Sequence, residues 1–339
     1  MPVALDVQER IRQQRLDFSD LESLLAAGPP HPYAAYPDLF PPRELARYAL
    51  STARETIERN RDTTFWRTGP QGLSALVAWS PLAWDSEQFG FPAGRIELLF
   101  ARGEYQEARR LKSSLVAEAL EGCSGARIRH VTARVDTGDM SSIHALEKNG
   151  FEIIDQIQTL GFRLSDAPAV ERRDNPCKVG LFALEHLNDI LSLARTLYQF
   201  DRFHSDPSLP NGVADRLHEA WMRNSCLNGT ADAVLVATVE DRVASYVTVK
   251  VDLAASKALG KRMATIVLVA TAEWARSKGM ARSATLAALD WCRDQGVAAV
   301  LVGTQLRNIA AAGLYQSCGF RLVGTSLTLR KVLQGGPGA

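Results

Sequence analysis

The sequence predicts an α/β (α+β) protein with two tandem domains, each built on one central sheet flanked by helices. Length and an internal repeat lead to this prediction. The 339 residues suffice for two domains of ordinary size. One pattern also occurs twice, without a gap, at an offset of 169 positions: Gly319-Phe320 repeats Gly150-Phe151, and Cys292 repeats Cys123. We expect domains over 1–170 and 177–333, followed by a flexible tail over 334–339.

The first domain is expected to open with a helical extension. Proline-rich breaks at Gly28-Pro29-Pro30 and Pro41-Pro42 divide its first ~70 residues. Helical spacing of apolar residues then predicts helices over 43–61, 107–120 and 141–148. Strand-like segments occupy 73–79, 95–100, 128–135 and 151–164. Because helices and strands alternate, we expect the helices to pack on one sheet.

The second domain repeats this order after a polar linker over 172–176. Helices are predicted over 187–198, 214–224, 280–294 and 308–317. Strands are predicted over 233–239, 243–251, 264–269, 298–303 and 321–332. The segment 250–262 has no clear periodicity, so we interpret it as a loose connection.

Composition excludes several classes of function. Lys and Arg number 39 against 38 Asp and Glu, which gives no electrostatic footprint for nucleic acid or an anionic membrane. No apolar segment approaches the ~18 residues that span a bilayer, and the N-terminus has no apolar region of a signal peptide. The five cysteines form no C-x-x-C pair, and their odd number argues against a disulfide framework. We therefore expect a soluble cytoplasmic protein without a metal.

The second copy carries a pattern suited to binding an anion. Arg276-x-x-Gly279-x-Ala281 follows an apolar strand and opens a helix, whose first N–H groups are unpaired and lie at the positive end of the dipole. Taken alone, the pattern is also that of an ordinary strand-to-helix turn. Asn308 opens the next helix, and Tyr315 lies two turns later on nearly the same face.

This order resembles the GNAT superfamily of acyl-CoA-dependent acyltransferases, through 276–281 and through 308–315 with Cys318-Gly319-Phe320. The resemblance implies mixed, largely antiparallel sheets and acetyl-CoA, or another acyl-CoA, as co-substrate. It implies that Tyr315 protonates the departing thiolate; a core aromatic residue is the alternative interpretation. The residues implied to contact the acyl-CoA are Leu268, Val269, Arg276, Ser277, Lys278, Gly279, Met280, Ala281, Arg282, Asn308 and Ala311.

A narrower resemblance concerns the acceptor. The segments 82–90, 201–207, 221–225 and 304–308 are similar to the family of dTDP-fucosamine acetyltransferases. This resemblance covers most of the chain and implies acetylation of a primary amine on an amino-sugar nucleotide. Many relatives have a glycine where Ala281 stands. The residues that the resemblance suggests for the acceptor are Trp84, Asp85, Arg202, His204 and Gln305.

Other acceptors stay open, because tandem architecture is shared with mycothiol synthase. The second choice is a small amine of secondary metabolism, with the acyl group on CoA or on an acyl carrier protein. Acetylation of a protein N-terminus comes third, and a non-catalytic module that senses acyl-CoA is a different class. A homodimer is plausible. Candidates for the base that deprotonates the amine are His204, Asp206, Asp252 and Glu273; Arg202 and Arg223 are candidates for contact with phosphates.

The first copy lacks the residues that this chemistry requires. Arg110 stands in the place of Gly279, Asp139 in that of Asn308 and Leu146 in that of Tyr315. A long side chain obstructs close approach of an anion to the backbone, and leucine has no proton to donate. We therefore predict that the first domain binds no acyl-CoA, supports the second and forms one wall of the acceptor pocket.

Overall fold

The computed structural model describes residues 16, 18, 20–26, 31–166 and 177–333. The predicted linker over 172–176 and the tail lie outside these residues. The helices of the first half are α2 (Leu21–Leu25), α3 (Pro42–Arg59), α4 (Ala83–Phe89), α5 (Tyr105–Gly125) and α6 (Met140–Lys148). Its strands are β1 (Thr64–Gly69), β2 (Gly72–Pro81), β3 (Ala93–Ala101), β4 (His130–Asp136) and β5 (Glu152–Arg163).

The second half repeats this succession. Its helices are α7 (Leu187–Leu197), α8 (Arg202–Ser205), α9 (Asn211–Leu227), α10 (Leu253–Leu259), α11 (Met280–Asp294) and α12 (Ile309–Ser317). Its strands are β6 (Lys178–Leu181), β7 (Ala233–Val239), β8 (Arg242–Asp252), β9 (Arg262–Thr271), β10 (Val297–Gln305) and β11 (Arg321–Val332). The segment 250–262 is therefore not loose: it holds the end of β8, helix α10 and the start of β9.

The sequence repeat is a repeat of structure. Helix α6 and strand β5 have exact counterparts 169 positions later in α12 and β11. The helix caps also match. The side chain of Asp139 accepts a hydrogen bond from the N–H of Ser142, and that of Asn308 accepts one from the N–H of Ala311. The two halves are thus copies of one fold.

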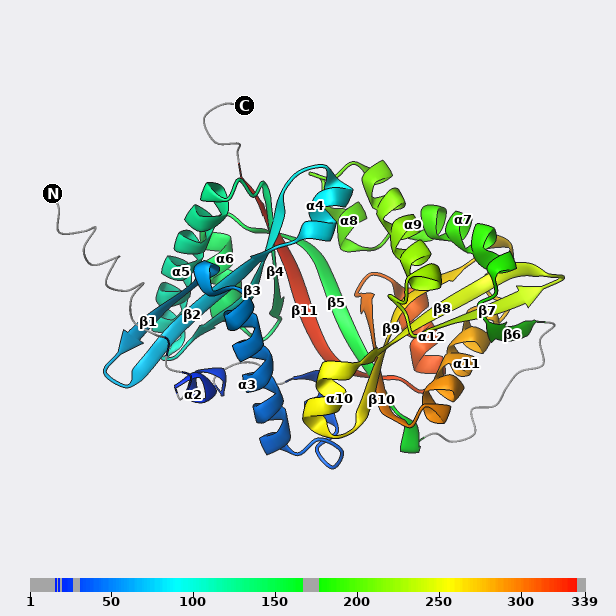
Figure 1. Cartoon of the computed structure of the whole chain (residues 1–339), viewed down its shortest axis with the longest axis horizontal. Helices are drawn as coiled ribbons and strands as arrows, with labels where there is room; N and C mark the ends of the chain where they lie inside the picture. The colour runs from blue at the N-terminus through cyan, green and yellow to red at the C-terminus, as the bar shows by residue number, and fades with distance from the viewer. Residues whose placement is uncertain (1–15, 17, 19, 27–30, 167–176, 334–339) are drawn as a thin grey trace.

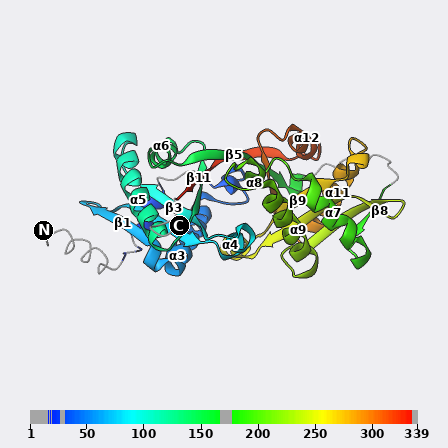
Figure 2. The ribbon, with the colours of Figure 1, turned by 90° about the horizontal axis from the view of Figure 1, so that it is seen from above.

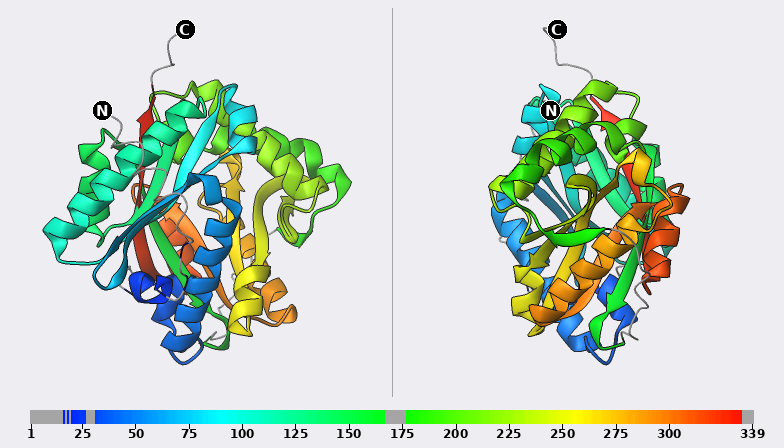
Figure 3. Two further views of the ribbon diagram at one scale, coloured as in Figure 1. Left: turned by 60° about the vertical axis from the view of Figure 1, so that its left-hand side comes forward. Right: turned by 90° about the vertical axis from the view of Figure 1, so that its right-hand side faces the viewer.

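All eleven strands form one sheet, in the order β1-β2-β3-β4-β11-β5-β10-β9-β8-β7-β6. The last strands of the two halves are exchanged: β11 pairs with β4 of the first half, and β5 pairs with β10 of the second. Figures 1 and 3 show β11 and β5 side by side between the two lobes. The predicted α/β class with flanking helices is confirmed, but our expectation of one separate sheet per half is wrong.

Helices cover both faces of this sheet (Figure 2). In the second half, α11 and α12 pack on one face around Val300, Val302 and Leu289, whereas α7 and α9 pack on the other around Tyr246 and Leu268. Each helix buries an apolar stripe against the strands. None of the described helices is both long enough and apolar enough to cross a membrane.

Candidate active site

The N-terminus of α11 presents free backbone donors. Gly279 is its N-cap residue with φ 83°, a left-handed conformation that glycine adopts without strain, and it contributes no capping side chain. The first helical turn, at Met280 and Ala281, has N–H groups without intrahelical acceptors. By contrast, a side chain caps both α6 and α12. The segment Arg276 to Ala281 therefore forms a glycine turn that opens a helix, as we predicted, and its geometry suits a diphosphate. Binding of an anion there stays a prediction.

Strands β9 and β10 separate next to this turn. They pair in parallel only as far as Ile266 and Val302, after which β10 continues along β5. The rest of β9, 267–271, is not paired with β10. A bulge in the β8–β9 pairing lies opposite this opening, and the N–H of Leu268 donates to Thr248 Oγ1 over 2.9 Å. We predicted that Leu268 and Val269 contact the acyl-CoA. The N–H of Leu268 already donates a hydrogen bond within the sheet.

A cleft of about 740 Å³ joins this opening to the N-terminus of α11. The C-terminal part of β9, the end of β10, helix α12 and the segment 197–203 line it, together with three residues of β4 and β5. Every residue predicted to contact acyl-CoA lines the cleft except Lys278. Their roles in binding remain predictions, but one surface does bring them together.

Tyr315 lies where the cleft meets the core. Its side chain is 4% exposed and packs against Phe320, with ring centroids 5.8 Å apart. Its hydroxyl makes no hydrogen bond to any described residue, and the residue lines the cleft. Burial raises the pKa of Tyr315 above its usual value, so the phenol keeps its proton at neutral pH. Tyr315 is therefore an aromatic residue of the core that also lines the cleft, and its role as proton donor stays a prediction.

The five residues suggested for the acceptor divide into two groups. Arg202 and Gln305 line the cleft. Asp85 lies behind Arg202 and pairs with it over 3.3 Å, while Trp84 packs edge-on against Trp221. These contacts join α4 of the first half to α8 and α9 of the second. His204, like Trp84 and Asp85, is not part of the cleft lining.

The four candidate bases are all engaged elsewhere. His204 is held by two carboxylates, as described below. The carboxylate of Asp206 accepts hydrogen bonds from His130 and Arg330 across the junction of the two halves. Burial favours a higher pKa for Asp206, but the hydrogen bonds from His130 and Ser208 outweigh it and hold the pKa well below its usual range.

Asp252 and Glu273 also lie away from the cleft lining. The side chain of Asp252 caps α10 by accepting from the N–H of Ala255. Glu273 is exposed and lies 3.7 Å from Arg276. Arg223, a candidate for phosphate contact, pairs instead with Glu219 on the exposed side of α9. The four candidate bases and Arg223 are thus all absent from the cleft lining.

Several cleft residues escaped our reading of the sequence, among them Arg134, Asp155 and His218. Arg134 and Asp155 lie on β4 and β5, and both pair in register with Thr328 of β11, so they share one face of the sheet. Asp155 accepts a hydrogen bond from Gln305 over 3.3 Å. Only the strand exchange brings the two first-half residues to this cleft. The first copy thus contributes part of the cleft wall, and a role of this wall in binding the acceptor stays a prediction.

The first copy has no turn equivalent to that of α11. Helix α5 starts at Tyr105, so Arg110 lies within the helix rather than at its N-terminus. We expected the Arg110 side chain to block the approach of an anion to a turn, but the first copy has helix α5 where the second copy has the turn before α11. Lys112, at the position of Ala281, is buried and pairs with Asp139.

Comparison with known proteins agrees with this geometry. Residues 190–320 match the model of the acetyltransferase (GNAT) family. No curated protein matches the sequence. A GCN5-related N-acetyltransferase from Sphaerobacter thermophilus has a similar structure, with TM-score 0.59 and 13% identity over 85% of this chain and 86% of that one.

Two other solved structures are similar in fold. The tandem GNAT protein from the clavulanic acid biosynthesis pathway has TM-score 0.53 and 13% identity, over 81% of this chain and 83% of its own. The glucosamine N-acetyltransferase region of a fungal multi-domain beta-N-acetylglucosaminidase has TM-score 0.59 and 15% identity, over 93% of this chain and 36% of that one.

The fold, together with the family match over residues 190–320, supports the class of GNAT-type acyl-CoA-dependent N-acetyltransferases. Residues 190–320, within the second half, match the GNAT acetyltransferase family, and the solved structures share the fold. Members of this family use acetyl-CoA. The uncapped turn at Gly279 fits the diphosphate of such a molecule, and the opening beside β9 fits its pantetheine arm.

Proposed function

We propose that the protein transfers an acetyl or other small acyl group from CoA to a primary amine on an amino-sugar nucleotide. The amine attacks the thioester carbonyl, and Tyr315 protonates the departing thiolate. The observation that carries this proposal is the continuity of the cleft, which runs from the α11 N-terminus past Tyr315 to the charged residues of β4 and β5.

Arg134 supports an acceptor that carries phosphate. Its side chain is exposed to the cleft and makes no hydrogen bond or ion pair with any described residue. Desolvation of the guanidinium within the cleft, together with the nearby charge of Arg202, outweighs Asp155 and lowers the pKa of Arg134 to about 10, which still leaves it charged at neutral pH. The two neighbouring arginines differ, because Arg202 pairs with Asp85 and Arg95 with Glu97. An unpaired guanidinium in a cleft suits a phosphate group.

The sugar part of the acceptor has two supports. Asp155 offers carboxylate oxygens that accept hydrogen bonds, and Gln305 offers an amide that can both donate and accept them. Both residues line the cleft with Arg134, and the hydroxyl groups of a sugar need such partners. A structure of similar fold is a glucosamine N-acetyltransferase region. A small amine of secondary metabolism, with a CoA- or carrier-bound acyl group, is the second candidate, favoured by the similarity to the clavulanic acid pathway protein.

An acceptor panel tests the proposal. Purified protein is incubated with acetyl-CoA and each of glucosamine, its phosphates, amino-sugar nucleotides and small diamines, and release of CoA is measured. We expect the highest kcat/KM with a phosphate-bearing amino sugar. Arg134→Gln should lower kcat/KM for that acceptor about 10- to 100-fold, the effect of one charged hydrogen bond, and change it little for glucosamine.

Arg223→Gln is the matched control, because this arginine is exposed and outside the cleft lining. A preference for uncharged diamines, unaffected by Arg134→Gln, would instead support the second candidate. Acetyl-CoA binding without CoA release for any amine would favour a non-catalytic sensor.

A further inference from the structure

His218 occupies the wall of the cleft opposite α12. It lies on α9, is 2% exposed, and stacks face to face on Tyr198 with ring centroids 4.3 Å apart. Trp221, one turn further along α9, continues this wall. The hydroxyl of Tyr198 lies 3.2 Å from that of Tyr246, so the aromatic wall is anchored in the core. The ring of His218 is therefore fixed in one orientation.

The hydrogen bonds of His218 define which ring nitrogen carries the proton. Its Nδ1 lies 2.9 Å from the carbonyl oxygen of Ala214, and because a carbonyl only accepts, Nδ1 must be the donor. In the neutral ring the lone pair therefore belongs to Nε2. His218 Nε2 lies 3.8 Å from Asp201 Oδ2, which is beyond hydrogen-bond distance. The lone pair of His218 is thus not committed to another group.

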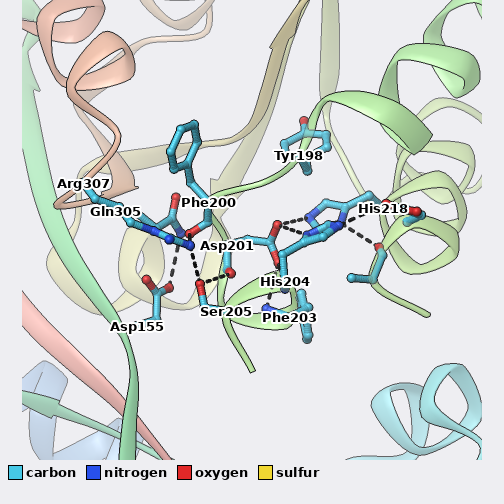
Figure 4. Close-up of polar contacts among 12 residues, drawn as sticks. Asp155, Tyr198, Phe200, Asp201, Phe203, His204, Ser205, His218, Gln305 and Arg307 are labelled. Atoms are coloured by element: carbon cyan, nitrogen blue, oxygen red, sulfur yellow. Dashed lines mark hydrogen bonds and ion pairs between the residues drawn. The ribbon is translucent and has the colours of Figure 1, made fainter. Parts of the chain in front are cut away.

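His204 differs from His218 in this respect (Figure 4). Its Nδ1 lies 2.6 Å from Asp201 Oδ2 and its Nε2 lies 3.0 Å from Asp215 Oδ1. The hydrogen bond with Asp201 raises the pKa of His204 despite its burial. With both nitrogens bonded to carboxylates, His204 has no lone pair to offer. Its contacts hold Asp201 in place, and Asp201 also accepts from the N–H of Phe203.

We propose that His218 is the general base that removes a proton from the acceptor amine, and that Asp201, held by His204, is a positioning residue that stabilises the resulting imidazolium. This inference rests on the proposed function. The amine must lose its extra proton before it can attack, and a fixed imidazole with a free lone pair in the cleft wall suits that task.

The proton balance closes with Tyr315. An ammonium acceptor gives one proton to His218 Nε2, and its neutral nitrogen then forms the new bond to the acetyl carbon. As the carbon–sulfur bond breaks, the sulfur takes the phenolic proton of Tyr315. The second proton lost by the nitrogen restores that phenol, and His218 later releases the first proton to solvent. The products are an amide, CoA thiol and one proton.

The electrostatics around His218 support a neutral resting state. Burial lowers the pKa of His218, while the carboxylates of Asp201 and Asp215 raise it and a charged His204 lowers it further. The net direction is downward from the usual ~6.5, so the ring is neutral at pH 7. The rate should therefore fall as pH decreases through the pKa of His218.

The same side chains could be taken for a metal site, since ligand atoms of Asp201, His204 and His218 lie within 4.8 Å of one another. Two ligands on a tetrahedral zinc ion lie roughly 3.3 Å apart, given metal–ligand bonds of about 2.0 Å. The 2.6 Å between His204 and Asp201 is instead a hydrogen-bond distance. We therefore assign the cluster to proton transfer.

The test compares His218→Gln with wild type, using acceptors of different basicity. With an acceptor amine that is protonated at neutral pH, we expect kcat to fall at least about 100-fold, within the range of general-base catalysis. With hydroxylamine, whose nitrogen is neutral at pH 7, the loss should be much smaller. The affinity for acetyl-CoA, from calorimetry, should not change. His144→Gln in α6, a half-buried histidine that is hydrogen-bonded to Tyr105 and lies outside the cleft lining, is the control.

Two further measurements separate a base from a structural residue. In Asp201→Asn the acidic limb of the pH–rate profile should move to lower pH, because the carboxylate that stabilises the imidazolium is lost. NMR of ¹³C-labelled histidine should show the His218 ring neutral at pH 7 with its proton on Nδ1.

Even where His218→Gln loses activity, three outcomes would overturn the assignment of His218. These are equal losses with both acceptors, a ring protonated at pH 7, or activity that vanishes with a zinc chelator and returns with zinc. Retained turnover in His218→Gln would overturn only the role of His218. A wild-type protein that acetylates no amine would overturn the proposed function and this role together.

Discussion

Nζ of Lys112 lies 2.9 Å from both carboxylate oxygens of Asp139. The same ammonium group contacts the hydroxyls of Ser141 and Ser142, and Lys112 is 4% exposed. At the offset of 169 positions, Lys112 corresponds to Ala281 of the second half and Asp139 corresponds to Asn308. The first half therefore has an internal ion pair at the positions where the second half has an open cleft.

Lys112→Met should destabilise the protein. The substitution leaves the carboxylate of Asp139 without its cation, which costs about 3 kcal/mol for a largely buried pair. Urea unfolding measures the change in the free energy of unfolding. Lys112→Met combined with Asp139→Asn should recover part of this loss, because the amide oxygen still caps α6 and no charge is left unpaired. Acetyl-CoA affinity should be the same in all three proteins; a loss of binding in the single variant alone would contradict the separation of the two sites.

The Lys112–Asp139 pair also gives stability a defined pH dependence. Burial alone favours a higher pKa for Asp139, but hydrogen bonds from Ser142 and the charge of Lys112 outweigh it and lower the pKa. The stabilisation is then complete above the unfolded pKa of about 3.9 and is lost as pH falls through the folded pKa. Between pH 5 and pH 3, wild type should lose more stability than Lys112→Met. Parallel curves for the two proteins would show that the pair contributes nothing.

Gly279→Ala should weaken acetyl-CoA binding about 10-fold. The φ of 83° strains any other residue by roughly 1 kcal/mol, and the added methyl group lies at the N-terminus that we expect to approach the diphosphate. Calorimetry should give one acetyl-CoA per wild-type chain, since only the second copy has this turn. Gly260→Ala is a matched control with φ 66° at the end of α10, where a methyl group meets open space. Similar losses in both variants would indicate general strain, and two sites per chain would contradict the role of the first copy.

Tyr315→Phe should lower kcat about 100-fold or more while acetyl-CoA affinity stays nearly unchanged, because the phenol acts only when the thiolate leaves. The ring packing against Phe320 is preserved, so the fold should persist. Stopped-flow and steady-state assays of CoA release measure the effect. Tyr105→Phe, on the exposed start of α5, serves as control. Unchanged turnover would leave Tyr315 as a core residue only.

The exchanged strands should make the two halves unfold together. Without β11, strands β4 and β5 lose the partner that lies between them, so neither half keeps a complete sheet. Variants with tryptophans in only one half, either 66, 79 and 84 or 221, 274 and 291, report on each half separately. We expect coincident urea transitions, and removal of residues 321–339 should unfold both. Two separated transitions would mean that the halves are independent domains.

The sequence predicted local structure because local chemistry determines it. Helix α11 and strands β7 and β11 have the predicted bounds, since periodicity and breakers act over a few residues. The turn at Gly279 was predictable for the same reason: a glycine before a helix is a local signal. Short elements such as α8 and α10 were missed because so few residues carry no clear period.

The residues of the proposed acceptor site depend on distant pairings. Arg134 and Asp155 resemble any charged residue on a strand, and His218 resembles any polar residue on a helix. They meet because β11 passes between β4 and β5, and because α9 packs its aromatic residues against β8 and β9. The alternation of β11 is satisfied equally well in either half, so its sequence does not specify its partner.

The sequence by itself determined the duplicated fold, the anion-binding turn and the choice of the second copy for chemistry, because each follows from residues close together in the chain. Only the tertiary structure decided that the two sheets are one, that the first copy is filled by Lys112 and Asp139, and that His218 faces the cleft. These features arise from contacts between segments up to about half the chain apart, where hydrogen-bond geometry and burial, rather than local pattern, select the partners.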